Sequence, residues 1–326
     1  MMVHGSGGRS TGDLIEEVFK DAFSNEYLDK LEDAAVVPGP AEGESIAFTT
    51  DSFVVTPVIY RGGNLGRLSI CGTVNDLLMR GAVPKYLTCG FIIEEGADVE
   101  TLKTIVKSMA DTAKEAGVLL VAGDTKVIEG HGGIMVNTAG IGYVKKDINI
   151  SSENAKPGDV IIVSGNLGDH HACILSERMK VDSDIESDNA PLSEMVSKLS
   201  SLPVHTMRDV TRGGLGTVLK ELSVASETAF NIYEDKIPVS EKVRDFCGIL
   251  GLDPVYMGNE GKMVTVLPKE YEEKALSLIR SSRYGENAVT IGEVTDDDKG
   301  RLFMKTKIGG VRELSVLEGE GLPRIC

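Results

Sequence analysis

The stretch Ser45-Ile46-Ala47-Phe48-Thr49-Thr50-Asp51 sets the fold of the first half of the chain. Its side chains alternate with a period of two, which predicts a strand that ends at Asp51, where the chain is expected to turn. Residues 64–80 then show helical spacing and carry Asn75 and Asp76. A solvated helix residue is the alternative for Asp76. A strand-end carboxylate beside a helix carboxylate nevertheless makes a plausible magnesium pair, because hard cations prefer oxygen ligands.

Strands and helices keep alternating after this helix. Residues 86–93 form a predicted strand, and a helix follows Asp98. Residues 118–122 read as a short buried strand that ends in Gly123-Asp124-Thr125-Lys126, and 133–144 is another β-rich run. This order predicts a mixed α/β domain rather than an all-β one.

A polar segment at 151–158, which contains Pro157-Gly158, predicts the boundary to a second domain that begins with a strand at 159–164. The sharpest internal motif is Arg208-Asp209-Val210-Thr211-Arg212-Gly213-Gly214-Leu215, which precedes an apolar helix face. Glycines at a helix N-terminus leave backbone N–H groups free, so Asp209 and this turn suit a metal-bound phosphate. Further on, Gly258-Asn259-Glu260-Gly261-Lys262 presents a carboxylate just before a strand at 263–267, although an ordinary Asn- and Gly-rich turn is an equal alternative.

Composition narrows the class of protein. The 326 residues are 41% hydrophobic and 26% charged, with a formal net charge of −16, as expected for a soluble two-domain protein that does not bind nucleic acid. No segment resembles a membrane span or a signal peptide, so a cytoplasmic location is expected. The acidic balance points to magnesium held by carboxylates rather than to a Lys/Arg cradle for phosphates. The run typical of a P-loop and the dinucleotide fingerprint are both missing from the sequence.

The histidines, the cysteines and an acidic segment of the second half give no evidence for a further functional site. The expected loop 165–171 brings His170 and His171 near Cys173, but the spacing does not match zinc-site patterns, so no zinc is predicted. The five cysteines are scattered and odd in number, as reduced thiols are. Residues 180–190 are acidic and serine-rich, which predicts a solvated excursion.

The two ends of the sequence carry the remaining motifs. His4-Gly5-Ser6-Gly7-Gly8 is a glycine loop before an amphipathic segment, and it reads either as a flap over phosphates or as a flexible end. Residues 311–326 show no helical or strand period and finish in Gly321-Leu322-Pro323-Arg324-Ile325-Cys326. A mobile tail that ends in a thiol, next to a site for ATP, can act as a carrier arm.

These termini together resemble those of the HypE family of hydrogenase maturation proteins, and the resemblance extends over essentially the whole chain. That family is part of the PurM-like superfamily of aminoimidazole ribonucleotide synthetase, selenophosphate synthetase and thiamine monophosphate kinase, whose members bind ATP without a P-loop. The resemblance implies an N-terminal ATP-binding domain (1–150) that dimerises through its sheet, a larger C-terminal α/β domain (151–310) and a mobile tail (311–326).

The resemblance also implies the chemistry. A partner, HypF, places a carbamoyl group on Cys326; the chain then uses ATP and Mg²⁺ to dehydrate this thiocarboxamide to a thiocyanate. The cyano group passes to iron held by HypC and HypD during maturation of [NiFe]-hydrogenase. The matching positions are Asp51, Asp76 and Asp209 for metal; Gly7, Gly8, Asn75, Asp124, Thr211 and Gly213 for ATP; and Cys326, Glu260 and Lys126 for catalysis.

Three points stay open at this level. Either Glu260 or Lys126 can assist proton removal. Val210 departs from the Pro or Ala that family members often carry at this position. An ATP-dependent enzyme of the same superfamily that acts on a free small molecule, and a non-enzymatic docking scaffold, are the alternative functions. The first leaves the cysteine tail without a purpose, and the second leaves the Asp-bearing motifs unexplained.

Overall fold

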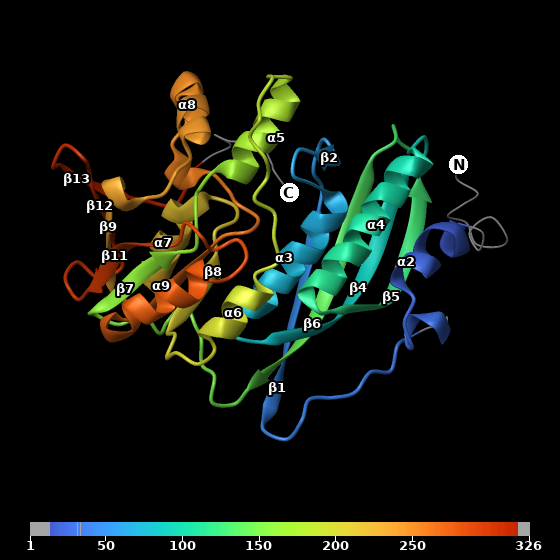
Figure 1. Ribbon diagram of the computed structural model, residues 1–326, viewed down its shortest axis with the longest axis horizontal. Helices are drawn as coiled ribbons and strands as arrows, with labels where there is room; N and C mark the ends of the chain where they lie inside the picture. Colours follow the sequence, from blue (N-terminus) through green and yellow to red (C-terminus); the bar gives the residue numbers. More distant parts are fainter. Residues whose placement is uncertain (1–13, 31, 33, 319–326) are drawn as a thin grey trace.

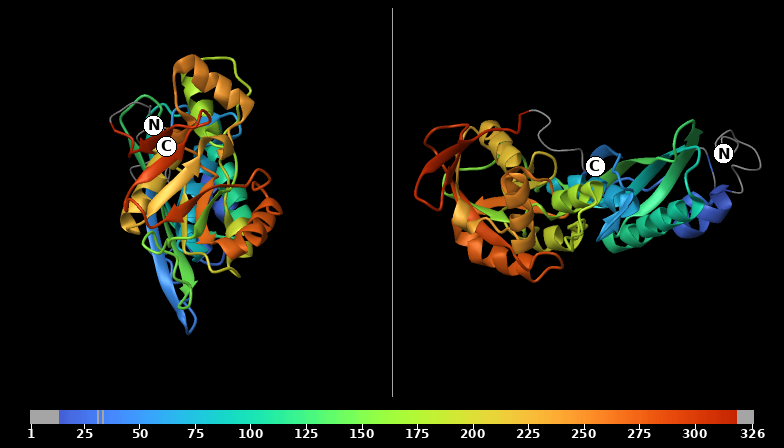
Figure 2. Two further views of the ribbon diagram at one scale, coloured as in Figure 1. Left: turned by 90° about the vertical axis from the view of Figure 1, so that its left-hand side faces the viewer. Right: turned by 90° about the horizontal axis from the view of Figure 1, so that it is seen from above.

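A computed structural model describes residues 14–30, 32 and 34–318. Gly7, Gly8 and Cys326 therefore lie outside the described residues. Two halves lie side by side along the long axis of the molecule, each built on its own sheet (Figures 1 and 2). Within the described part of the chain, no helix is long and apolar enough to cross a membrane.

The first half holds a four-stranded sheet in the order β1-β6-β4-β5, in which only β4 and β5 are parallel. Its elements are the π-helix η2 (Ile15–Lys20), α2 (Asp21–Phe23), η3 (Leu28–Lys30), β1 (Glu44–Phe53), β2 (Ile59–Tyr60), β3 (Gly63–Asn64), α3 (Leu65–Met79), β4 (Val83–Glu94), α4 (Val99–Ala116), β5 (Leu119–Ile128) and β6 (Ile134–Lys145).

The second half holds a seven-stranded sheet in the order β13-β12-β9-β11-β7-β10-β8. Its elements are β7 (Asp159–Val163), α5 (Asp169–Met179), α6 (Ser193–Leu199), β8 (Thr206–Asp209), α7 (Gly214–Ala225), β9 (Ala229–Tyr233), η4 (Glu234–Lys236), α8 (Glu241–Leu250), η5 (Pro254–Tyr256), β10 (Met263–Pro268), η6 (Lys269–Tyr271), α9 (Glu272–Arg280), β11 (Val289–Thr295), β12 (Leu302–Lys305) and β13 (Val311–Leu314).

Helix α3 joins the two halves. It packs on β1, β4 and β6 of the first sheet and also contacts β8 and α6 of the second half. It begins where the Asn64 side chain accepts hydrogen bonds from the backbone N–H groups of Gly66 (2.9 Å) and Arg67 (3.1 Å). A Cβ on Gly66 would lie 2.1 Å from the Ile105 carbonyl oxygen, so only glycine permits the close approach of α3 to α4. Almost every residue of α3 is buried, because apolar surface surrounds it.

The hydrophobic core continues from one half into the other. One cluster runs from the first sheet, α3 and α4 to α5, α6 and α9 of the second half. A second cluster lies between the seven-stranded sheet and α7, which contributes Leu215, Val218 and Leu222. The core therefore packs the halves against each other.

Among the described residues, α3 and α4 cover only the inner face of the four-stranded sheet; on the outer face Tyr27, just before η3, packs on Tyr86 of β4, and much of the rest is exposed. Ile46 on β1 is 59% exposed, Phe48 is 69% exposed, and Ile92 on β4 is 43% exposed. Lys126 pairs with Ile92, and Asp124 pairs with Gly90, so both β5 residues belong to this face. We call it the open face.

The structure confirms the mixed α/β fold with two sheet domains. Two predicted strand ends are wrong. β1 continues past Asp51 to Phe53, because its ladder with β6 persists, and β5 continues to Ile128, so Asp124 and Lys126 lie within a strand rather than after it.

Three further expectations are also wrong. His170 and His171 lie in the first turn of α5, not in a loop. Residues 311–314 form β13, which pairs with β12, so this part of the expected tail belongs to the sheet. The excursion at 180–190 begins in solvent but returns to bury Asn189 and Ala190.

Candidate active site

A cavity of about 520 Å³ lies between the halves. Asp51 of β1 and Asp76 of α3 line it from the first half. Asp209, Thr211 and Glu260 line it from the second half. The cavity thus collects carboxylates from four elements that are far apart in the sequence.

Asp51 and Asp76 come from adjoining surfaces of β1 and α3. The Asp51 Oδ1 atom accepts a hydrogen bond from the Ser52 backbone N–H (2.8 Å), and the Thr49 hydroxyl donates to Asp76 Oδ2 (2.9 Å). Burial raises the pKa of both carboxyl groups, and the charge of Asp51 raises the pKa of Asp76 further. Both members of the predicted pair therefore line the same cavity, with Asp51 placed within a strand rather than at its end, and their role as a magnesium pair stays a prediction.

Asp209 ends β8 opposite Met263 of β10 and is 9% exposed. Burial, followed by the charge of Asp76, raises its pKa to about 7. Glycines follow it because the turn into α7 is tight: Gly213 and Gly214 have φ values of 78° and 64°. A Cβ on Gly214 would lie 2.5 Å from the Tyr256 carbonyl carbon. No side chain caps α7, and its first N–H, that of Gly214, donates to the Thr211 carbonyl (3.0 Å), so only the N–H groups that follow in the first turn are left for an anion.

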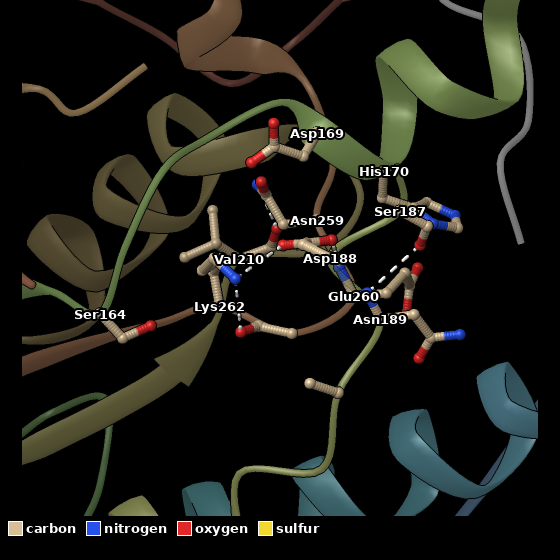
Figure 3. A network of polar contacts seen from close by, with 12 residues as sticks. Ser164, Asp169, His170, Ser187, Asp188, Asn189, Val210, Asn259, Glu260 and Lys262 are labelled. Atoms are coloured by element: carbon tan, nitrogen blue, oxygen red, sulfur yellow. Dashed lines mark hydrogen bonds and ion pairs between the residues drawn. The ribbon is translucent and has the colours of Figure 1, made fainter. Parts of the chain in front are cut away.

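Glu260 is 4% exposed, and its Oε1 atom has no hydrogen-bond partner among the described residues. Its backbone N–H donates to Asp188 Oδ1 (3.0 Å), and its carbonyl accepts from the Ala190 N–H (3.4 Å). Figure 3 shows Glu260 beside Asp188. Burial raises the pKa of this carboxyl well above its ordinary value, and Asp209, Asp188 and Asp51 add repulsion. Burial and the neighbouring carboxylates therefore both favour the protonated form of Glu260.

Asn259 fixes the position of Glu260, and sequence reasoning missed it. Its Oδ1 accepts from the Gly168 N–H (2.8 Å), while its Nδ2 donates to the carbonyls of Val210 (3.0 Å) and Met257 (3.1 Å). Figure 3 shows Asn259 beside Val210. Its own N–H also bonds to the Val210 carbonyl (2.9 Å). The Asp209 turn and the Glu260 turn are thus tied together. The sequence shows an Asn in a turn but not the partners of its amide.

Arginines also line the cavity, which the acidic composition did not predict. Arg208 and Arg212 stand in the motif around Asp209, and Arg80 follows α3. Arg208 Nη2 lies 3.3 Å from Glu221 Oε2. The sequence already indicated this positive charge, because the motif that begins at Arg208 holds two arginines within five residues.

Four predicted site residues lie outside the cavity lining, and one of them, Gly213, stands next to Arg212, which lines it. Asn75 is 2% exposed; its amide donates to the Ala190 carbonyl (3.1 Å) and accepts from the Leu192 N–H (2.9 Å). Asp124 and Lys126 pair with each other at 2.7 Å on the open face. Their nucleotide and catalytic roles remain predictions.

The residues present fit a magnesium ion that is bound together with phosphates. Among the described residues, no group of three or more His, Cys, Asp or Glu side chains is arranged to hold a metal by itself. Mg²⁺ commonly takes one or two carboxylates plus substrate phosphates, so a complete protein cage is not required. Besides burial, the charges of Asp76 and Asp51 raise the pKa of Asp209, so a cation beside these carboxylates would relieve their repulsion.

The histidines near Cys173 have other contacts. His170 Nδ1 lies 2.7 Å from the Ser187 hydroxyl, and Cys173 Sγ donates to the Arg61 carbonyl (3.2 Å). His171 Nδ1 accepts from the Gly258 N–H (3.3 Å). These groups pack α5 against the β2–β3 hairpin and the Glu260 turn.

A second cavity of about 420 Å³ lies behind the Glu260 turn, and Lys262, Asp188 and Arg67 line it. Lys262 Nζ lies 3.5 Å from Asp188 Oδ2. Arg67 joins Glu115 (2.9 Å) and the Tyr284 hydroxyl (3.1 Å), which links the halves at the cavity wall.

Comparison with known proteins follows the same division of the chain. The family model described as AIR synthase related protein, N-terminal domain, matches residues 31–144, and the corresponding C-terminal domain model matches residues 156–305. Fold and site together define a two-domain AIR synthase related protein. A thiamine-monophosphate kinase from Stenotrophomonas maltophilia K279a shares the fold, with a TM-score of 0.68 at 18% identity over 85% of this chain and 89% of that one.

Closer relatives narrow the family. Carbamoyl dehydratase HypE of Azotobacter vinelandii is 45% identical over 332 residues, covering 100% of this chain and 96% of the relative. The Escherichia coli K12 carbamoyl dehydratase HypE is 42% identical, covering 100% and 98%. A crystal structure of hydrogenase maturation protein HypE in complex with ATP superposes with a TM-score of 0.95 at 43% identity, covering 100% and 99%. This chain belongs to the HypE family of carbamoyl dehydratases.

Replacing Asn75 tests whether its amide is structural. Asn75→Ala leaves the buried Ala190 carbonyl and Leu192 N–H without this partner, so the free energy of unfolding should fall by about 2–4 kcal/mol in chemical denaturation. Asn154→Ala, which removes an exposed side-chain hydrogen bond, should change it by about 0.5 kcal/mol. Equal stability of the two variants would contradict the anchoring role, and calorimetric titration of Asn75→Ala with ATP tests the predicted nucleotide contact.

Proposed function

We propose that the cavity between the halves is where this carbamoyl dehydratase uses ATP to turn a carbamoyl group on a cysteine thiol into a thiocyanate. The product supplies the cyanide ligand of iron in [NiFe]-hydrogenase maturation. One observation carries the proposal: Asp51 and Asp76 from one half and Asp209 and Glu260 from the other line a single cavity. They do so in a chain that matches carbamoyl dehydratases over its full length.

The reaction has to remove the oxygen of a carboxamide, which is a poor leaving group. The amide oxygen attacks the γ-phosphorus of ATP, and the bond from that phosphorus to ADP breaks. The carbon–oxygen bond then breaks, and the oxygen leaves as part of phosphate. The nitrogen loses both protons as the carbon–nitrogen triple bond forms. One proton remains with the phosphate, and the other is released.

The second half offers backbone and hydroxyl contacts for the phosphates. The uncapped N-terminus of α7 presents N–H groups, and Thr211 and Gly213 stand in the turn before it. We assign both residues to phosphate binding. A related HypE structure contains ATP, which supports ATP as the nucleotide here.

Asp51, Asp76 and Asp209 would hold magnesium beside these phosphates. The bound ion would supply positive charge that offsets the negative charge of the phosphoryl group. The carboxylates would orient the phosphates by fixing the position of the positively charged ion. Hydrogen bonds from Ser52 and Thr49 hold Asp51 and Asp76 in place.

Glu260 is placed to handle a proton of the carboxamide. Its Oε1 atom is buried and free of hydrogen bonds among the described residues, and its side chain lines the cavity. Positive charge entering the cavity lowers its pKa, after which the carboxylate can accept a proton from nitrogen. Lys126 is the alternative base, so the assignment between the two stays open.

The carrier of the carbamoyl group is proposed to be Cys326. Its support is the motif Pro323-Arg324-Ile325-Cys326, together with the buried state of Cys71, Cys89, Cys173 and Cys247, which are free thiols. The crystal structure of a HypE–HypF complex, 48% identical over 93% of this chain and 99% of that one with a TM-score of 0.81, supports HypF as the carbamoyl donor. HypC and HypD are proposed as the iron-bearing acceptors.

The same four buried cysteines indicate the cellular compartment of the reaction. Free thiols that stay reduced are typical of a reducing compartment, so we place the reaction in the cytoplasm.

A homodimer through the open face is part of the proposal. Exposed apolar side chains on a sheet face without a covering helix are typical of an interface. Asp124 and Lys126 lie on that face, so dimerisation would place them at the contact between two copies.

Removing one carboxylate of the metal set should weaken ATP binding. Asp51→Asn or Asp209→Asn should raise the Kd for ATP with magnesium about tenfold or more in calorimetry, because a negative oxygen ligand is lost. Asp111→Asn, on the exposed outer surface of α4, should leave the Kd unchanged. Wild-type affinity in both cavity variants would refute the metal assignment.

Mass spectrometry tests the carrier and the base. Carbamoylated protein incubated with ATP and magnesium should lose about 18 Da, one water, from the peptide that contains Cys326. Cys326→Ala should abolish carbamoylation, and Glu260→Gln should keep the carbamoylated species but slow its dehydration about 10²- to 10⁴-fold. Modification at Cys71 or Cys89, or full activity of Cys326→Ala, would rule out the tail as carrier.

Light scattering tests the dimer. The chain should be dimeric at micromolar concentration, and Ile92→Asp should shift it toward monomer because the change buries a charge in the interface. Ile249→Asp is the matched control, since Ile249 is 83% exposed on α8 and away from the open face. A wild-type monomer would count against the open face as an interface.

A further inference from the structure

In the cavity between the halves, the carboxylates and a bound triphosphate together bring more negative charge than bound metal ions alone would neutralise. Asp51, Asp76 and Asp209 each bring a carboxyl group, and a nucleoside triphosphate brings several negative charges more. Even two divalent cations leave this set negative. Transfer of a phosphoryl group onto a neutral amide therefore benefits from a positive side chain next to the phosphorus.

Arg212 is placed to supply that charge. It lines the cavity between Thr211 and Gly213, directly before the uncapped N-terminus of α7. The turn that carries it is rigid: the Gly214 N–H donates to the Thr211 carbonyl (3.0 Å), and a Cβ on Gly213 would lie 2.5 Å from the Thr217 hydroxyl oxygen. Its backbone is thus fixed while its side chain stays exposed.

The guanidinium of Arg212 is not engaged elsewhere in the described structure. It has no hydrogen bond or ion pair there, whereas the neighbouring Arg208 pairs with Glu221. Its positive charge offsets part of the rise in pKa that burial causes at Asp51, Asp76 and Glu260, which come from three different elements. All three groups line the same cavity as Arg212.

We propose that Arg212 is a catalytic residue whose guanidinium binds the non-bridging oxygens of the phosphoryl group as it passes from ADP to the amide oxygen. The bond between the γ-phosphorus and the ADP oxygen breaks while the bond to the amide oxygen forms. The guanidinium keeps its proton throughout and stays with the phosphate until it leaves. This inference rests on the proposed function, since it assigns a residue to the phosphoryl transfer of that reaction. The planar fork of arginine matches two phosphate oxygens, which a lysine ammonium does not.

Arg212→Gln is the primary test, on full-length carbamoylated protein with saturating ATP and magnesium. Its dehydration rate should fall about 10²- to 10⁴-fold, while the Kd for ATP changes less than about tenfold, because the contact matters most during transfer. Arg212→Lys should recover only part of the rate. Arg244→Gln, an exposed arginine on α8 outside the cavity, should retain the wild-type rate. Guanidinium ion added at millimolar concentration should accelerate Arg212→Ala but not wild type.

A second measurement separates this inference from the proposed function. ADP with aluminium fluoride, which mimics a transferring phosphoryl group, should bind wild-type protein more tightly than ADP alone, and Arg212→Gln should lose this gain but keep its affinity for ADP. If Arg212→Gln loses this gain while the wild-type chain dehydrates nothing, the result would support Arg212 and refute the proposed function. An unchanged gain and an unchanged dehydration rate in Arg212→Gln would overturn the assignment of Arg212.

Discussion

Repulsion between buried carboxyl groups is the constraint on which the rest of the structure depends. Asp51, Asp76, Asp209 and Glu260 share one cavity; burial raises the pKa of each, and neighbouring carboxylates raise it further at Asp76, Asp209 and Glu260. Such an arrangement costs stability in the free chain, because ionised groups lose their hydration. The continuous core around α3 and the hydrogen bonds of Asn75 and Asn259 offset this cost. A cation-bearing nucleotide then finds a site whose carboxyl groups are already in place.

The division of the site between two halves explains why α3 is buried on all sides. The helix carries Asp76 toward the cavity and Asn75 toward the segment at Ala190 and Leu192. One turn of the helix therefore serves both the site and the packing of the halves. A polar outer face on α3 would weaken that packing and separate Asp51 and Asp76 from Asp209 and Glu260.

The sequence could predict what depends on local pattern. The strand at 45–51, the helix at 64–80 and the glycine turn after Asp209 follow from side-chain period and backbone freedom, and the structure confirms them. The sequence could not predict where β1 and β5 end, because pairing of β1 with β6 and of β5 with β4 decides how far each strand continues. β13 was missed for the same reason: Val311–Leu314 shows no period, and its partner β12 makes it a strand.

Side-chain partners were harder to predict than elements. Asn75 and Asp76 are adjacent in sequence and looked like one motif, yet they point to different partners, because successive helical residues diverge by about 100°. Arg212 was overlooked for a related reason. Its importance depends on charges from β1, α3 and the Glu260 turn, which meet only in the folded chain. Net charge describes the whole surface, whereas catalysis depends on the few charges that face one cavity, so an acidic protein can still present an arginine where a phosphoryl group needs it.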